Sequence, residues 1–192
     1  MRKLFVVMIA LMAAVIYSPK VLGQENPLSY SKVVQAEGLS ADEIFSRARA
    51  WVATTFNSAN DVTQLAENNM IVLKAMQQFD YKLNGLTGSD NRVNYTFTVE
   101  CRDGRYRVSI SNMYLTSRIT TAVYNPDIQP MDFGVLTEAP ANTRPAGMST
   151  NSTKKQCEKI WIAAKMYMET FVLNMVDSLS SAVDSATTEE DW

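Results

Sequence analysis

The sequence predicts an α+β domain in which antiparallel strands are combined with two long amphipathic helices. Three observations lead to this fold class: a capped apolar stripe at 41–56, an alternating hairpin around Asp103-Gly104, and a second apolar stripe at 154–184. Hydrophobic residues make up 46% of the chain and charged residues 20%, which is typical of a globular domain and excludes a disordered chain or a coiled-coil rod.

The first helix has the clearest local signals. Ser40 and Glu43 have the spacing of a capping box, in which the serine hydroxyl accepts from the backbone N–H of residue 43 and the glutamate reaches back. Apolar residues then recur at spacings of three and four, which predicts one buried stripe: Ala41, Ile44, Phe45, Ala48, Trp51, Val52 and Phe56. The residues before it, 30–36, are predicted to form the first strand.

Between the helices the hydrophobic period changes from 3.6 to 2. Strands are predicted at 61–67 and 70–81, joined at Asn68-Asn69, because asparagine tolerates the left-handed turn conformation. Glycines and polar residues predict a loop at 83–91. The proline-rich stretch 117–152 has no periodicity and is predicted to be irregular, which is typical of a functional or mobile segment.

Asp103-Gly104 predicts a two-residue hairpin with a type I′ turn, in which both central residues have positive φ. In that register, residues whose numbers sum to 207 stand opposite each other. One face is apolar except for Asn112, with the pairs Cys101–Tyr106, Val99–Val108, Phe97–Ile110, Tyr95–Asn112 and Val93–Tyr114. The other face is polar, with the pairs Glu100–Arg107, Thr98–Ser109 and Thr96–Ser111. We therefore expect one covered face and one wet face.

The first 23 residues predict an export signal. Arg2 and Lys3 precede an uncharged apolar run of 13 residues at 4–16, and Val21-Leu22-Gly23 offers a cleavage site before Gln24. Spanning a bilayer takes about 20 apolar residues, so we expect no membrane span after cleavage near Gly23 and a periplasmic or extracellular location. The expected divisions are a signal peptide at 1–23, a single domain at 24–184 and an acidic tail at 185–192.

Composition excludes several functional classes. The chain has no histidine, which removes Ser–His–Asp and Cys–His catalysis and every histidine-bearing metal site. Without residues 1–23 the chain carries 15 basic and 20 acidic side chains, a net charge of −5, which disfavours binding to nucleic acid. We expect no catalytic residues, no metal site and no cofactor.

Cys101 and Cys157 are the two cysteines of the chain. An even pair in an oxidising compartment is compatible with a disulfide. The alternative is a pair of buried thiols that act as small hydrophobic side chains. The sequence leaves both alternatives open.

The order of elements and two local stretches resemble a known family. The stretches are 45–51, which includes Trp51, and the sequence of the predicted hairpin, Cys-Arg-Asp-Gly-Arg-Tyr-Arg-Val at 101–108. They resemble a secreted bacterial domain family of unknown function described as having a TBP-like fold. The resemblance covers 30–116 and implies a curved antiparallel β-sheet with two long helices packed on one face. It also implies that Cys157 begins the helix covering the face of Cys101. It carries no catalytic residues to transfer, and the fold name does not imply DNA binding.

We therefore expect an exported, non-catalytic binding domain of the cell envelope, with an envelope protein or glycan as its partner. The expected contact surface combines the wet face with the irregular segment: Thr96, Thr98, Arg107, Ser109, Ser111, Tyr124 and Phe133. One alternative is a glycan hydrolase, which needs two carboxylates about 5–10 Å apart. The other is a carrier of a small apolar ligand, which needs an enclosed cavity of roughly 300 Å³ or more.

Overall fold

The computed structural model describes residues 26–56, 63–83, 87–121, 130–140, 145 and 154–185. Within these residues six strands and two helices occur, in the order β1 (Tyr30–Gln35), α1 (Ala41–Thr55), β2 (Thr63–Glu67), β3 (Met70–Lys82), β4 (Thr87–Arg102), β5 (Arg105–Thr121), β6 (Met131–Val135) and α3 (Lys154–Ser185). The predicted signal at 1–23 lies outside the described residues, as does most of the predicted tail.

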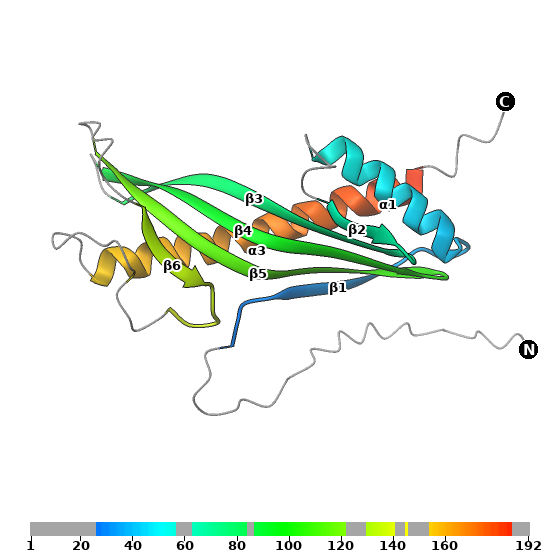
Figure 1. Cartoon of the computed structure of the whole chain (residues 1–192), viewed down its shortest axis with the longest axis horizontal. Coiled ribbons are helices and arrows are strands. Elements are labelled where there is room, and N and C mark those ends of the chain that lie inside the picture. Colours follow the sequence, from blue (N-terminus) through cyan, green and yellow to red (C-terminus); the bar gives the residue numbers. More distant parts are fainter. Residues whose placement is uncertain are drawn as a thin grey trace, which may run out of the picture.

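The strands form one antiparallel sheet in the order β1-β5-β4-β3-β2, and β6 also pairs with β5. β1 lies along β5 from Arg105 to Ile110, whereas β6 pairs with the far half of β5 at 114–117. Both helices lie on the same face of this strongly twisted sheet, and α3 runs along its length (Figure 1). The predicted α+β fold class, with two long helices packed on one face of a curved antiparallel sheet, is confirmed.

The capping box at the start of α1 forms as predicted. The Glu43 backbone N–H donates to the Ser40 hydroxyl, and the Ser40 backbone N–H donates to the Glu43 carboxylate at 2.8 Å. The Ser40 hydroxyl also donates to the Glu43 carboxylate at 2.7 Å, and this hydrogen bond, together with that from the Ser40 backbone N–H, holds the pKa of Glu43 below its usual range. The two backbone N–H groups that are satisfied here would otherwise be left unpaired at the helix start, which explains why the helix begins at Ala41.

The two predicted turns differ in backbone conformation. At Asn68-Asn69 both residues have positive φ, of 51° and 59°, as expected of a type I′ hairpin. At the second turn only Gly104 has positive φ, of 72°, so the predicted type I′ turn is wrong there. Contacts from outside the hairpin hold this turn: the Ala41 N–H donates to the Asp103 carboxylate, and Gly104 exchanges backbone hydrogen bonds with Ala36 and Leu39.

The predicted hairpin register is correct from the turn to Thr96–Ser111 and wrong beyond it. Asn112 has a φ of 53° and forms a β-bulge, after which Val93 stands opposite Leu115 and not Tyr114. A bulge places two residues opposite one and reverses the faces that the following side chains occupy. Met113 and Leu115 are therefore fully buried, while Tyr114 is 37% exposed.

Two segments predicted to be irregular contain strand. β4 begins at Thr87, inside the predicted 83–91 loop, and β5 continues to Thr121 while β6 follows at 131–135. The buried polar residues explain the first error. The amide of Asn91 donates to the Phe79 carbonyl and accepts from the Ser117 hydroxyl at 2.8 Å, so a polar side chain occupies the covered face with its hydrogen bonds satisfied.

The core lies between the sheet and the two helices. The ring of Trp51 on α1 lies 5.8 Å from that of Phe97, and Tyr167 on α3 stacks on Phe79 at 4.3 Å. The helices also contact each other, since the Trp51 indole N–H donates to the Ser178 hydroxyl at 3.0 Å. No helix in the described part of the chain carries an apolar stretch long enough to cross a membrane.

Candidate functional site

The polar face predicted from the hairpin lies opposite the helices. Thr98 pairs with Ser109 and Thr96 pairs with Ser111, while Arg107 stands opposite Glu100. None of these side chains is buried: Arg107 is exposed and the threonines and serines are half-buried. We call this surface the open face, defined by Thr96, Thr98, Glu100, Arg107, Ser109 and Ser111.

The two aromatic residues predicted to join this surface differ in their outcome. Tyr124 lies outside the described residues. Phe133, in β6, is half-buried and packs against the hydrophobic core, so the structure does not bring it to the open face. Its neighbour Asp132 accepts a hydrogen bond of 2.6 Å from the Tyr114 hydroxyl, and this bond raises the pKa of Tyr114.

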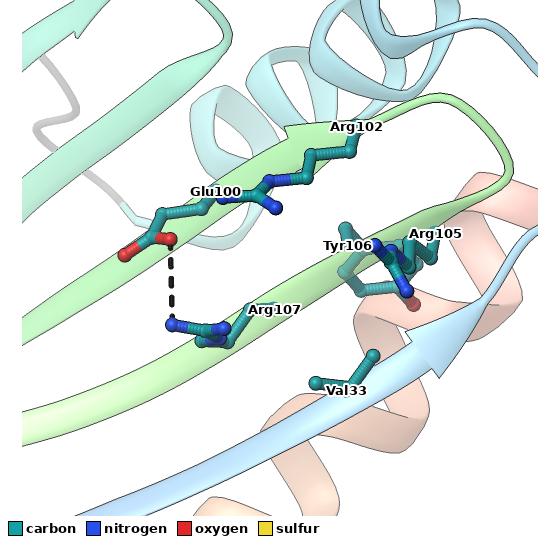
Figure 2. Close-up of a pocket in the computed structure, with 6 residues that line it drawn as sticks. All are labelled: Val33, Glu100, Arg102, Arg105, Tyr106 and Arg107. Carbon is teal, nitrogen blue, oxygen red and sulfur yellow. Dashed lines mark ion pairs between the residues drawn. The ribbon is translucent and has the colours of Figure 1, made fainter.

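A pocket of about 130 Å³ opens at the hairpin end of the open face. Figure 2 shows its lining residues, which come from three adjacent strands: Val33, Glu100, Arg102, Arg105, Tyr106 and Arg107. Three of the six are arginines, and Arg102 stands directly opposite Arg105 in the β4–β5 register. We call this the arginine pocket.

Acidic groups only partly balance the charge of the arginine pocket. Glu100 lies 3.7 Å from Arg107, in a pair whose arginine side chain is half exposed. Such exposed pairs contribute about 0–1 kcal/mol to stability and separate readily. Among the described residues, Arg102 and Arg105 have neither an ion pair nor a side-chain hydrogen bond. The adjacent Asp103 carboxylate binds the start of α1 at 2.8 Å from the Ala41 nitrogen.

Sequence reasoning missed Arg102, Arg105 and Val33 as candidate site residues. A signal for the two arginines was present, because they flank the Asp103-Gly104 turn and the register places them opposite each other. Nothing in the sequence indicated Val33, whose place beside Arg107 depends on the pairing of β1 with β5.

Both cysteines are buried, and no disulfide joins them in this structure. Tyr106, which stands opposite Cys101, lies near Ser180 and Asp184 in the last turns of α3. Cys157 is in the first turn of that helix. At a rise of 1.5 Å per residue, Cys157 lies about 35 Å along the helix from Ser180. It is therefore much farther from Cys101 than the limit of about 7 Å between the Cα atoms of a disulfide. Burial raises the pKa of the Cys101 thiol to about 11.

Two carboxylates of the kind that the hydrolase alternative requires meet on neighbouring strands. Asp80 stands opposite Asp90, and Asp90 also lies 3.9 Å from Arg92. On β5 the residue opposite Asp90 is Arg118, so cations flank this pair on one side. The described residues contain no group of three or more Cys, Asp or Glu side chains arranged to hold a metal ion.

Comparisons with known proteins agree with this architecture. Residues 30–116 match a family model described as "Domain of unknown function (DUF4468) with TBP-like fold". A TBP-like protein from Parabacteroides distasonis ATCC 8503 superposes with a TM-score of 0.53 at 17% identity, over 82% of this chain and 95% of the other. A DUF4468 family protein from Bacteroides ovatus ATCC 8483 gives a TM-score of 0.49 at 15% identity, over 86% of this chain and 90% of the other.

The comparison with curated proteins found no match. The resemblance expected from the hairpin text and the first helix is therefore confirmed, and at 17% identity the solved structure shows the fold alone. Over residues 30–116, this chain is therefore similar to the DUF4468 family of domains of unknown function with a TBP-like fold.

Proposed function

We propose that the chain is an exported, non-catalytic binding domain of the cell envelope and that its open face is the contact surface. The observation that carries the proposal is the separation of the two sides of the sheet. Helices α1 and α3 cover one side, whereas the polar residues of β4 and β5 on the other side are exposed or half-buried. Because only one face of the sheet packs against the protein's own core, the other face is available to a partner.

Further support comes from the chemistry of this face. Hydroxyl side chains and guanidinium groups recognise polar partners through hydrogen bonds, and a surface built on paired strands is rigid. The apolar run at 4–16 supports export, and the expected partner is an envelope protein or glycan. The acidic balance of the chain disfavours nucleic acid as a partner.

A blocking substitution on the open face tests the proposal. Thr96→Tyr with Ser111→Tyr enlarges two side chains that stand opposite each other, and tyrosine is well tolerated in strands. The full chain is exported from a host, recovered in its processed form and used to capture partners from the native envelope. We expect the wild type to retain a specific partner and the double variant to lose it.

Asn174→Tyr is the matched control, because Asn174 is exposed on α3, away from the open face. The control variant is expected to retain the partner. Capture of the same partner by the double variant, or no specific capture by the wild type, would contradict the proposed function.

A further inference from the structure

We propose that the arginine pocket binds the phosphate or carboxylate group of a small ligand. The inference rests on the proposed function, since it names the chemistry of the group that one end of the open face takes. Four features support it: an excess of positive charge, the spacing of the arginines, the size and lining of the pocket, and the rigidity of its backbone.

The charge of the pocket is unbalanced. Its lining holds three guanidinium groups and one carboxylate, in a chain whose overall formal charge is −2. The Glu100–Arg107 contact of 3.7 Å offsets one of the three, and the pair is too exposed to hold Arg107 firmly. Among the described residues no other acidic side chain forms an ion pair with these arginines, so the cluster is able to stabilise an external anion.

The arginines are spaced to act on one anion. Arg102 and Arg105 are cross-strand partners, and Arg107 follows two residues later on the same face of β5. Directly opposed side chains have Cβ atoms about 5 Å apart, so their flexible stems can converge on a single group. In Figure 2, Arg102 extends along β4 toward Glu100, while Arg107 reaches Glu100 across the strands. A guanidinium donates two parallel N–H groups, which match the oxygens of a phosphate or a carboxylate.

The pocket also has an apolar border. Val33 on β1 stands opposite Arg107 and is 49% exposed, an unusual position for a large aliphatic side chain. A volume of about 130 Å³ accommodates one anionic group with a few adjoining atoms. The pocket therefore fits the charged end of a small organic ligand, whose carbon atoms would lie against Val33.

The backbone below the pocket is held in place before any ligand binds. The Ala36 N–H donates to the Gly104 carbonyl and the Gly104 N–H donates to the Leu39 carbonyl, each at 2.9 Å. The Asp103 carboxylate accepts from the Ala41 N–H at the start of α1, and it is in none of the ion pairs found among the described residues. Binding then requires only the ordering of arginine side chains, which keeps its entropic cost small.

Titration with inorganic phosphate and, separately, with citrate tests the inference, at constant ionic strength set with sodium chloride. The arginine Nε–Hε signals of the exported protein report binding by NMR. We expect saturable shifts for at least one anion, and a dissociation constant raised about tenfold or more by Arg102→Gln or Arg105→Gln. Arg92→Gln is the matched control, because Arg92 lies on the same side of the sheet but outside the pocket, and it should change the constant less than twofold.

The anion that binds more tightly identifies the ligand as a phosphate or a carboxylate compound. Absence of saturable shifts, or equal weakening by Arg105→Gln and Arg92→Gln, would overturn the inference, as would tighter binding of a single-stranded oligonucleotide than of either anion. The Thr96→Tyr, Ser111→Tyr variant lies outside the pocket and should still bind the anion. Failure of the arginine pocket is thus distinguishable from failure of the open face as a docking surface.

Discussion

A single residue, Asn112, changes which side chains of β5 enter the core. Its φ of 53° lies in the left-handed region, where asparagine and glycine are tolerated and β-branched residues are strained. The bulge that it forms buries Met113 and Leu115 and turns Tyr114 outward. The apolar positions of β5 are therefore even-numbered before Asn112 and odd-numbered after it. A prediction that assumes unbroken alternation places the later side chains on the wrong face.

Asn112→Val should lower the free energy of unfolding by about 1–2 kcal/mol, because a β-branched side chain is strained in the left-handed conformation. Asn112→Gly should leave stability within about 1 kcal/mol of the wild type. Urea denaturation measures both. The control is Asn94→Val, the same change at an exposed position of β4 with ordinary backbone φ, which is expected to have little effect. Equal destabilisation by the two valine variants would contradict this account of Asn112.

At the scale of elements, the start of α1 is attached to the β4–β5 hairpin. The Asp103 carboxylate accepts from the Ala41 N–H, one of the donors that a helix leaves unpaired in its first turn. Its negative charge also lies at the positive end of the helix dipole. The same contact joins the helix to the turn between Arg102 and Arg105, so α1 helps to position the floor of the arginine pocket.

Asp103→Ala should destabilise the protein by about 1 kcal/mol, since it removes both the acceptor and the charge from the helix start. Asp103→Asn keeps an acceptor oxygen and should cost about half as much. Thermal and urea denaturation of the two variants measure the difference. Stabilities of both variants indistinguishable from the wild type would show that the contact does not hold the helix start.

The local elements were predictable because their signals lie within a few residues of one another. The Ser40–Glu43 capping box, the turn at Asn68-Asn69 and the alternation of Val99 and Phe97 with Thr98 all depend on neighbours in sequence. The strand starting at Thr87 was not predictable, because Ser89 and Asn91 have the polar character of a loop. Their burial is possible because residues of neighbouring strands supply hydrogen bonds: the Tyr81 carbonyl accepts from Ser89, and Asn91 bonds to the Phe79 carbonyl and the Ser117 hydroxyl.

At the scale of the whole molecule, burial of ionisable groups determines the response to alkaline pH. Burial raises the pKa of Cys101 to about 11, and burial is also the main cause of the raised pKa values of Tyr30, Tyr95 and Tyr106. Above pH 9 to 10 the unfolded chain releases these protons while the folded protein retains them. The unfolded state then binds fewer protons, so the free energy of unfolding falls as pH rises.

We therefore expect the contribution of these groups to stability to be fully present below about pH 9, with that of Cys101 lost as pH rises through 11 and those of the tyrosines, whose pKa values burial raises further, lost only at higher pH. Each fully buried group contributes a slope of roughly 1 kcal/mol per pH unit. Urea denaturation between pH 8 and 11 measures the decline, and Tyr95→Phe should make it shallower by removing one such group. A free energy of unfolding that stays constant to pH 11 would contradict the prediction.

Some of the candidate site was evident from the hairpin register, and some was not. The polar pairs Thr98–Ser109 and Thr96–Ser111 follow from alternation on two strands joined by a short turn. The arginine pocket also needs β1, which is about 70 residues away in sequence from its partner β5. The hydrophobic pattern of a strand does not indicate which distant strand it pairs with, so the contribution of β1 to the pocket could not be predicted from the sequence.

The amino-acid sequence by itself determined the α+β class, both long helices, the positions of the two tight turns and the polar side of the central hairpin, because short-range periodicity and capping specify these features. Only the tertiary structure decided the bulge at Asn112, the added strand β6, and the direction of α3, which separates Cys157 from Cys101. It also decided the convergence of Val33 with three arginines. Each of these depends on which distant segments pack together, and packing free energy is shared among many residues that no local pattern records.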